Sequence, residues 1–345
     1  MDTTGPRPLL AVTLGDPAGI GPEIVARTLA DPETSRVGRG IAVGDAAALR
    51  RAVEVCRLPV AVRSVARIGE ATFEDGTIEV LDLGISGPEQ PWGQVDATAG
   101  RSAIAAIERA AEAALAQEVE AIVTAPINKE AIWAAGSRHL GHTEMLGELT
   151  GSKRYATMFV VRDVKIFFTT RHMSLRNALS QITRSKVEQA IQEAVTALRV
   201  FGHDRPRLAV AALNPHAGEN GNFGDEELVA IGPAVEHART GGLQVTGPVP
   251  ADSVFHLALQ GRYDGVLSHF HDQGHIAAKT YDFDGTIAVT AGLPILRTSV
   301  DHGTAFDIAG TGTASYATMA SAFHAAARFA PFADRIRAEY GGASV

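Results

Sequence analysis

The sequence predicts an α/β fold built on mostly parallel sheets, and two observations support this class. Short apolar runs of strand length do not alternate with polar residues, which is typical of strands buried on both faces of a parallel sheet; they are Leu9–Leu14, Ala121–Thr124, Leu208–Leu213 and Val266–Phe270. Between them lie stretches with apolar residues at helical spacing, Ser102–Ala116 and Lys186–Val200. Strands and helices that alternate along a chain indicate an α/β fold.

A further pair of apolar runs predicts a local exception to the parallel arrangement. The runs ATMFVV and KIFFTT flank Arg162 and Asp163, which is the pattern of a β-hairpin. Near the C-terminus, Ala314–Ala327 again has helical spacing. A chain of 345 residues is long enough for two domains, and we expect two.

The composition argues against several classes of protein. With 31 Lys and Arg against 39 Asp and Glu, the formal charge is −8, so we expect no nucleic-acid partner. The first residues lack a signal-peptide pattern and no apolar run approaches the roughly 18 residues of a membrane span, so we expect a cytoplasmic protein with no membrane partner. The single cysteine, Cys56, indicates a reducing compartment. Any metal site would need imidazole or carboxylate ligands, and the chain has twelve histidines.

Each of the four apolar runs leads into a loop rich in Gly, Pro, Asn, Asp or His. These loops are GDPAGIGPE, APINKE, NPHAGENG and HDQGH. In open α/β sheets, ligands bind beyond the carboxyl ends of the strands, so four such loops suggest one shared site. Each loop taken alone is more typical of a simple turn than of a site.

The segment SHFHDQGH, residues 268–275, has the highest density of possible ligands. A strand would place His269 and His271 on one face, whereas a helix starting near Asp272 would bring His271 and His275 together at positions i and i+4. The alternative is a helix start capped by Asp272 with the histidines satisfied in the core. His271, at the strand end, is the best candidate ligand.

Two further histidines follow predicted strands. His172 follows the hairpin, and His216 follows Leu208–Leu213. Three imidazoles on one cation, with one position left open, is a catalytic arrangement for zinc or a similar metal. The spacing alone leaves open whether His172, His216 and His271 converge.

A glycine-punctuated segment, residues 297–312, precedes the C-terminal helical pattern and could hold a nucleotide. Small residues let a nucleotide approach the backbone, and a helix start can hold an anion. The candidate cofactor-binding residues here are Asp301, His302, Gly303, Asp307 and Gly310. The chain has neither a G-x-G-x-x-G fingerprint after a strand nor a P-loop, which disfavours a standard Rossmann site and an NTPase.

Eight ordered motifs give the chain a family resemblance. They are GDPAGIGPE (15–23), TAPINK (124–129), GHTE (141–144), the TT-H-SLR region (169–176), LNPHAGE (213–219), GPVPAD (247–252), HDQG (271–274) and RTSVDHGTAFDIAG (297–310). In this order the sequence resembles the 4-hydroxythreonine-4-phosphate dehydrogenase family of pyridoxine biosynthesis. The last motif is also similar to the nucleotide-binding segment of isopropylmalate and isocitrate dehydrogenases, whose fold that family shares.

The resemblance implies a homodimer of two-domain α/β/α sandwich subunits, with an active site in the interdomain cleft that is shared between subunits. A divalent cation would be bound by His172, His216 and the partner subunit's His271. The substrate would be held by His142, Thr143, Lys279 and Arg297, and NAD or NADP would bind without the usual glycine fingerprint. We place the nucleotide-side domain at residues 1–125 with 290–345, and the substrate, metal and dimerisation domain at 126–289.

A reaction follows from these implied roles. The cation, zinc or alternatively magnesium, cobalt or nickel, would stabilise the substrate alkoxide as hydride leaves for the nicotinamide, and the resulting 3-keto acid decarboxylates. Lys279 and Arg297 would bind the substrate phosphate. We hypothesise that Asp272 orients the ligand His271, the alternative being a helix cap.

One position departs from the family pattern. Ala288 stands where the family usually carries an Asn that contacts the substrate, and the HDQGH and DIAGTG variants look like a branch that oxidises 4-phospho-D-threonate or 4-phospho-D-erythronate. A more distant branch oxidises cis-dihydrodiol dicarboxylates. From other classes, a metal-dependent hydrolase and a non-catalytic sugar-phosphate sensor remain as alternatives. The hydrolase gives the nucleotide-like segment no role, and binding alone would not require a metal with an open position.

Overall fold

A computed structural model describes residues 7–342, which divide into two compact units. The first unit contains residues up to 155 together with those from 287 onward, and the second contains residues 156–286. The first unit is discontinuous in sequence, and residues 126–155 lie within it. The reason is that helices α5 (Lys129–Ala134) and α6 (His142–Leu149) both pack on α4 (Ala97–Leu115).

The first unit is built on a mostly parallel sheet with strand order β3-β4-β2-β1-β5-β12-β11. Only the β11–β12 pair is antiparallel. The strands are β1 (Leu9–Thr13), β2 (Arg39–Gly44), β3 (Ala61–Val65), β4 (Thr77–Asp82), β5 (Ala121–Thr124), β11 (Thr286–Ala291) and β12 (Arg297–Ser299).

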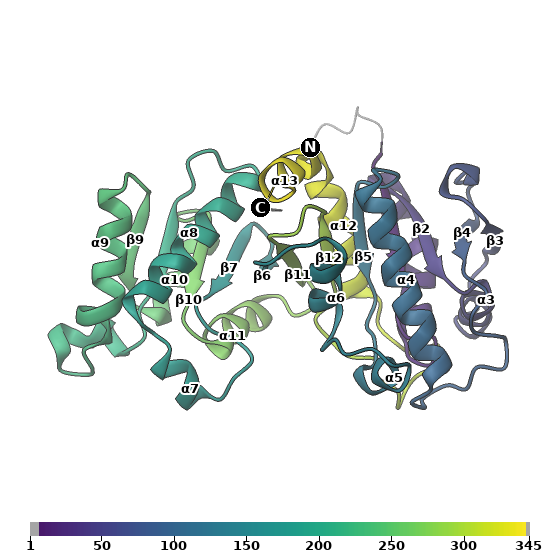
Figure 1. The fold of residues 1–345 in the computed structure, drawn as a ribbon, viewed down its shortest axis with the longest axis horizontal. Coiled ribbons are helices and arrows are strands. Elements are labelled where there is room, and N and C mark those ends of the chain that lie inside the picture. Colours follow the sequence, from purple (N-terminus) through teal and green to yellow (C-terminus); the bar gives the residue numbers. More distant parts are fainter. Residues whose placement is uncertain (1–6, 343–345) are drawn as a thin grey trace. The chain divides into compact units, whose positions relative to one another are not determined.

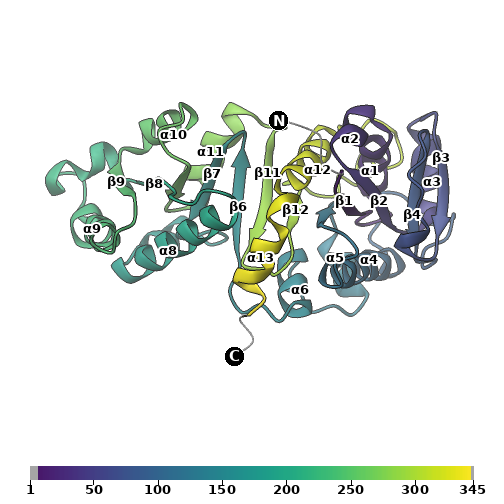
Figure 2. The ribbon, with the colours of Figure 1, turned by 90° about the horizontal axis from the view of Figure 1, so that it is seen from above.

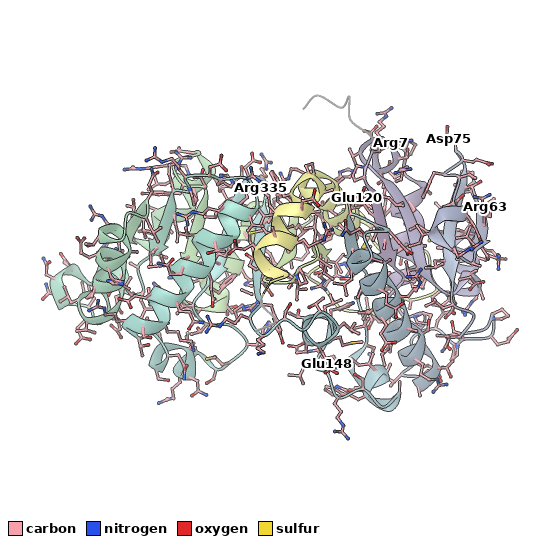
Figure 3. The ribbon with its side chains drawn as sticks, turned by 45° about the horizontal axis from the view of Figure 1, so that its top comes forward. Arg7, Arg63, Asp75, Glu120, Glu148 and Arg335 are labelled. Atoms are coloured by element: carbon pink, nitrogen blue, oxygen red, sulfur yellow. The ribbon has the colours of Figure 1, made fainter. Side chains whose placement is uncertain are left out.

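Helices cover both faces of this sheet. Figure 2 shows α4, α5 and α6 on one face and α1, α2 and α12 on the other. The remaining bounds are α1 (Gly21–Ala30), α2 (Pro32–Val37), α3 (Ala46–Val55), α12 (Ala317–Phe329) and α13 (Ala333–Tyr340), with 3₁₀ turns at Ile68–Glu70 and Ala330–Phe332. Charged side chains such as Glu120 and Glu148, both labelled in Figure 3, lie on the exposed outside of the unit.

The second unit has the strand order β6-β7-β10-β8-β9. Its strands are β6 (Ala156–Val161), β7 (Val164–Phe168), β8 (Leu208–Ala211), β9 (Val245–Val249) and β10 (Gly265–Ser268). The predicted hairpin is confirmed, because β6 and β7 pair antiparallel across Arg162 and Asp163, whereas the other pairs are parallel.

Helices also cover both faces of this second sheet. In Figures 1 and 2, α8 lies on one face and α10 and α11 on the other. The helices are α7 (Leu175–Ser180), α8 (Arg184–Val200), α9 (Gly232–Thr240), α10 (Ala251–Leu259) and α11 (His271–Tyr281), with a 3₁₀ segment at Pro215–Gly221 and a π-helical turn at Glu227–Ile231. Each unit is therefore an α/β/α sandwich, as the sequence predicts.

The predicted helices are present, and side-chain caps explain where two of them begin. The helix expected from Ser102 starts five residues earlier, at Ala97, because the Asp96 carboxylate accepts hydrogen bonds from the amides of Thr98 and Ala99. The helix expected from Lys186 starts at Arg184, where Thr183 is the N-cap. Among the described residues, none of the helices is both long and apolar enough to cross a membrane.

Candidate functional site

In the first unit, the loops that follow β1 and β5 meet at the carboxyl edge of the sheet. The two strands are parallel neighbours, and the amide of Asp16 donates to the Pro126 carbonyl at 3.0 Å. The Asp16 side chain is fully buried; one oxygen accepts from the Ala18 amide at 2.8 Å, while the other has no partner among the described residues. Burial raises the pKa of Asp16 to about 6.

Arg297 is a buried cation at the start of β12. Its guanidinium donates to the hydroxyl of Thr124, at the end of β5, with distances of 3.1 and 2.8 Å, and to Thr290 of β11 at 3.1 Å. Only 6% of Arg297 is exposed, and within the described residues no carboxylate forms an ion pair with it. Burial lowers the pKa of Arg297 to about 10, which leaves it charged at neutral pH. The hydrogen bonds of this buried guanidinium go to neutral hydroxyls, and the Glu144 carboxylate acts on it through its charge without an ion pair, so the guanidinium can still bind an anion.

His142 and Thr143 begin helix α6, close to this guanidinium. His142 Nε2 is buried and has no hydrogen-bond partner among the described residues. Burial and the charge of Arg297 hold the pKa of His142 well below its ordinary value, so the imidazole is neutral. The first backbone amides of a helix also favour an anion. His142 therefore lies within reach of the Arg297 charge, and Thr143 follows it in the first turn of α6.

The predicted nucleotide segment is a loop, and part of it is already occupied by protein contacts. The buried carboxylate of Glu23 accepts hydrogen bonds from the amides of Gly310 and Gly312 at 2.6 and 2.9 Å. The Gly310 amide is thus committed to Glu23 and cannot also donate to a cofactor phosphate. The other candidates remain predictions: Gly303 and Asp307 are exposed, Asp301 is half-buried, and exposed His302 contacts the Gly303 carbonyl at 3.0 Å.

In the second unit, the loops that follow β8 and β10 are joined by a single glutamine. The side chain of Gln273 accepts from the His269 amide and donates to the Ala212 carbonyl, both at 2.7 Å. His269 itself is fully buried, with its ring nitrogens at 2.7 Å from the Ala211 carbonyl and 3.2 Å from the Thr169 hydroxyl. Burial lowers the pKa of His269 to about 4. His269 is therefore a neutral core histidine and not a metal ligand.

His271 is the first residue of α11, and its ring is oriented by the next residue. The N-cap of the helix is Phe270, so the alternative role of Asp272 as an N-cap is wrong. Asp272 instead places its carboxylate 2.7 Å from His271 Nδ1, which leaves Nε2 as the nitrogen able to bind a metal. His275, one turn later, stacks on the His271 ring at 3.8 Å and is buried against Phe159 and Phe168.

The candidate metal ligands are only partly brought together within one chain. The rings of His172 and His271 lie 5.9 Å apart. Two imidazoles that share one zinc ion at a Zn–N distance of about 2.1 Å have ring centres roughly 5 to 6 Å apart, so this pair fits a common cation. Across the described residues, however, no group of three His, Cys, Asp or Glu side chains within one chain could hold a metal ion.

His216, the third candidate ligand, lies in the 3₁₀ segment after β8. It is exposed, its φ angle is 53°, and its ring centre lies 6.3 Å from that of Phe223. Lys279 is in the last turn of α11, two turns beyond His271, with its ammonium 5.3 Å from the centre of the Phe283 ring. Ala288 is buried on β11, opposite Ser299 of β12, and presents no polar side-chain atom.

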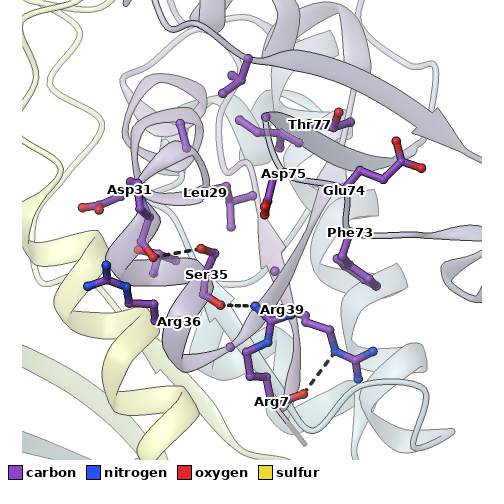
Figure 4. A pocket seen from close by; sticks show the side chains of 18 residues that line it. Arg7, Leu29, Asp31, Ser35, Arg36, Arg39, Phe73, Glu74, Asp75 and Thr77 are labelled. Atoms are coloured by element: carbon purple, nitrogen blue, oxygen red, sulfur yellow. Dashed lines mark hydrogen bonds between the residues drawn. The ribbon is translucent and has the colours of Figure 1, made fainter.

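A separate cavity of about 470 Å³ lies at the opposite, amino edge of the first unit's sheet (Figure 4). Arg39 Nε donates to the Arg7 carbonyl at 3.2 Å, and Arg7 donates to the Ser35 carbonyl at 2.5 Å. Asp31, Glu74 and Asp75 also line it. Arg7 and Arg39 are bonded to backbone and Arg36 is paired with Glu33, so this cavity offers no selective anion site, and none of the predicted site residues lines it.

Four residues that support the candidate site were not among those predicted from the sequence. Thr124 and Thr290 orient Arg297, Glu23 holds the nucleotide segment, and Gln273 joins two loops. Thr124, Glu23 and Gln273 lie inside the quoted motifs TAPINK, GDPAGIGPE and HDQG, which is the signal that could have found them. Thr290 lies outside every motif, and only the pairing of β11 with β12 places it beside Arg297.

Comparison with known proteins shows similarity along almost the whole chain. Residues 36–326 match the family model described as "Pyridoxal phosphate biosynthetic protein PdxA". A protein of Cutibacterium acnes named "Putative D-threonate 4-phosphate dehydrogenase" is 56% identical over 335 residues, which cover 96% of this chain and 97% of that protein.

Solved structures give the same result. A 4-hydroxythreonine-4-phosphate dehydrogenase from Klebsiella pneumoniae is 44% identical with a TM-score of 0.87, and the match covers 95% of this chain and 99% of that chain. A terephthalate 1,2-cis-dihydrodiol dehydrogenase from Burkholderia xenovorans LB400 is 29% identical with a TM-score of 0.60, over 91% of this chain and 95% of that chain. The protein therefore belongs to the PdxA family and is a dehydrogenase, an oxidoreductase for which the family implies NAD or NADP as the hydride acceptor.

Proposed function

We propose that this dehydrogenase oxidises D-threonate 4-phosphate. The main support for an anionic, phosphorylated substrate is the buried guanidinium of Arg297, which has no carboxylate partner among the described residues. It lies next to the ring nitrogen of His142, which has no hydrogen-bond partner there either. The choice among phosphorylated hydroxy acids rests on the 56% identity to the Cutibacterium acnes protein named for this substrate.

Each of these residues has a role in substrate binding that follows from its chemistry. Arg297 supplies a planar fork and Lys279 a point charge for the phosphate. His142 is neutral and can hydrogen-bond to a substrate oxygen through Nε2, while the first turn of α6, with Thr143, stabilises negative charge. Asp272 fixes the ring of His271 so that Nε2 faces outward.

We further propose that His172, His216 and His271 hold a divalent cation, with zinc the best match to three neutral imidazoles. When bound, the cation lowers the pKa of the substrate hydroxyl and the nicotinamide accepts the hydride. The set is supported by the orientation of the His271 ring, whose Nδ1 lies 2.7 Å from the Asp272 carboxylate so that Nε2 is left for a metal. The segment around Asp301, His302, Gly303 and Asp307 is the proposed cofactor contact.

The reaction balances as a two-electron oxidation followed by loss of carbon dioxide. The C3–H bond breaks with its electron pair to give a hydride to NAD or NADP, and the C3 hydroxyl gives a proton to solvent, which leaves a 3-keto acid. Breaking the C1–C2 bond releases carbon dioxide, and C2 takes up a proton. From D-threonate 4-phosphate the organic product is dihydroxyacetone phosphate, whereas 4-hydroxythreonine 4-phosphate would give the corresponding amine.

Two alternative substrates have weaker support. 4-Hydroxythreonine 4-phosphate carries an amine, and buried Ala288 offers no polar side-chain atom to contact it. The relative named for a cis-dihydrodiol substrate is only 29% identical to this chain. The hydrolase and sensor alternatives are set aside, because the family is one of dehydrogenases.

We also propose that the protein works as a homodimer through its second unit. Large apolar side chains are exposed there on α7, on α11 and beside them: Met173, Leu175, Leu179, Ile276, Tyr281 and Phe283. Exposed apolar surface of this extent is typical of an interface.

The proposed activity is tested by absorbance at 340 nm with both cofactors and three substrates: D-threonate 4-phosphate, D-erythronate 4-phosphate and 4-hydroxy-L-threonine 4-phosphate. We expect the highest kcat/KM with D-threonate 4-phosphate and one dihydroxyacetone phosphate formed per reduced cofactor. Preference for the amine substrate would contradict the proposal.

Arg297→Met tests the phosphate contact. Loss of the charge-assisted hydrogen bonds is expected to lower kcat/KM roughly ten- to a hundredfold. Arg36→Met removes an exposed arginine of the same unit and serves as the matched control. Equal kcat/KM for Arg297→Met and wild type would remove Arg297 from the substrate site.

A further inference from the structure

His216 is carried by a turn with an uncommon backbone conformation. The φ angles of His216, Ala217, Glu219 and Asn220 are 53°, 55°, 41° and 57°, and Gly218 between them has a φ of 76°. Left-handed conformations are disfavoured for L-residues, and four such residues persist only where their surroundings fix them. Two backbone hydrogen bonds within the turn, Ala217 to the Asn214 carbonyl and Phe223 to the Gly218 carbonyl, are 3.2 and 3.1 Å long.

The base of this turn is held by the carboxylate of Glu227. One oxygen accepts from the amides of Leu213 and Asn214 at 2.7 and 2.8 Å, and the other accepts from Asn214 Nδ2 at 2.9 Å. Only 4% of Glu227 is exposed. Burial by itself would raise the pKa of Glu227, but the hydrogen bonds from Asn214 and Leu213 outweigh it and lower the pKa. A charged carboxylate therefore joins the two residues at which the turn leaves β8.

The main chain of Glu227 is fixed by a second feature. Glu227 opens the π-helical turn Glu227–Ile231, which is closed by a hydrogen bond from the Gly232 amide to the Glu227 carbonyl. A Cβ atom at position 232 would lie 2.7 Å from that carbonyl oxygen, so only glycine fits without a shift. π-Helical turns are rare and often occur at functional sites. Glu227 is thus anchored to α9 at its backbone and to the His216 turn at its side chain.

Burying the charged carboxylate of Glu227 costs free energy, which a neutral side chain at this position would avoid. Glu227 is a buried carboxylate that accepts hydrogen bonds from neutral N–H donors, and among the described residues it forms no ion pair. A buried charge of this kind gives firm, directed acceptance of several donors. What it fixes is the starting point of the strained turn, two residues before His216.

We propose that Glu227 is a positioning residue, which holds the left-handed turn so that the His216 imidazole can bind the divalent cation. This inference rests on the proposed role of His216 as a metal ligand. Its consequence is that Glu227 sets metal affinity although it is itself no ligand.

The test is a titration of the metal-free protein with Co²⁺, followed by the visible d–d absorption of the bound ion. Glu227→Gln keeps the size of the side chain but replaces one acceptor oxygen with a donor. We expect its dissociation constant for Co²⁺ to rise roughly ten- to a hundredfold and its d–d spectrum to change, as for other residues that orient ligands. Glu236→Gln, an exposed Glu to Gln change on α9, is the matched control and should bind Co²⁺ as wild type does.

His216→Ala separates this inference from the proposed function. If His216→Ala binds Co²⁺ as tightly as wild type, the proposed ligand set fails. If His216→Ala loses binding while folded Glu227→Gln keeps wild-type affinity and spectrum, the ligand set stands and the positioning role is overturned.

A second variant covers the case in which Glu227→Gln does not fold. Gly232→Ala leaves the Glu227 carboxylate chemically unchanged but forces the Glu227 backbone to move, which displaces that carboxylate from Leu213 and Asn214. We expect it to weaken Co²⁺ binding in the same direction, with its melting temperature showing that the protein is folded at the assay temperature. Wild-type Co²⁺ affinity in folded Gly232→Ala would contradict the proposal.

Discussion

Asp16 is a fully buried carboxyl group whose ionisation works against folding. Its pKa is raised by burial from 3.8 to about 6, so the folded protein binds more protons than the unfolded chain between these pH values. The free energy of unfolding must then fall as pH rises from about 4 through 6. The stability associated with the neutral carboxyl is complete below pH 4 and lost above pH 6, and two pKa units correspond to about 3 kcal/mol.

Asp16→Asn removes this titration while keeping the acceptor for the Ala18 amide. We expect the variant to be more stable than wild type at pH 7, by up to about 3 kcal/mol. The difference should shrink toward pH 4. Urea unfolding at pH 4.5, 5.5 and 7 measures it, with exposed Asp334→Asn as the control. A stability difference that does not change with pH would show that Asp16 is already ionised throughout this range.

Single residues also show which functional roles can be predicted from the sequence and which require the structure. His271 and His172 could be picked out from position and chemistry, because strand ends are visible in the chain, whereas Arg297 was indicated only by the family resemblance. Asp272 could equally be a cap or an orienting carboxylate, and only the geometry of the helix start, with Phe270 as N-cap, decides between them. Glu227 carries no local signal, since its partners Leu213 and Asn214 lie more than ten residues away.

At the scale of elements, the strands and the hairpin were predictable from apolar patterning because their burial is set locally. The start of α4 was less so, since it depends on a single cap at Asp96. The π-helical turn Glu227–Ile231 was not predictable, because its sequence ELVAI is an ordinary helical one and the widening depends on the close approach of Gly232 to a carbonyl.

The position of α11 depends on a glycine in the HDQGH motif. A Cβ atom at Gly274 would lie 2.6 Å from the Phe168 ring and 2.9 Å from Ile166 Cγ2, both on β7. The ring cannot turn away freely, because it also packs on Phe159 and His275. Helix α11 therefore lies as close to β7 as a glycine allows.

Gly274→Ala is expected to push α11 away from the sheet. Overpacking of this kind costs about 1 to 3 kcal/mol, more than the gain of up to about 1 kcal/mol from helix propensity. Thermal unfolding measures the loss, and Thr280→Ala, on an exposed position of the same helix, is the control. A melting temperature at or above that of wild type would show that β7 accommodates the methyl group.

At the scale of the whole molecule, a net charge of −8 does not oppose a phosphorylated substrate. The negative charge is carried largely by exposed side chains such as Glu120 and Glu148, where solvent and salt screen it. Arg297 is buried, so solvent and salt screen its charge much less than they screen those surface carboxylates. Net charge describes the surface as a whole and carries no information about this local site.

The proposed homodimer predicts that each metal site takes ligands from both subunits. Within one chain no three described side chains of the His, Cys, Asp or Glu type form a metal-holding group, although His172 and His271 lie 5.9 Å apart. If a second copy completes the site, His216→Ala and His271→Ala damage different halves of it. In a mixed dimer, one site then carries both substitutions and the other carries neither.

Mixing the two inactive variants in equal amounts, after dissociation and reassembly, should therefore restore activity. Random pairing makes half of the dimers mixed, each with one of two sites intact, so about a quarter of wild-type activity is expected. Each variant reassembled alone is the control and should stay inactive. If all three histidines came from the same chain, every site in the mixture would lack one ligand, and the absence of any recovery would place the whole metal site within one subunit.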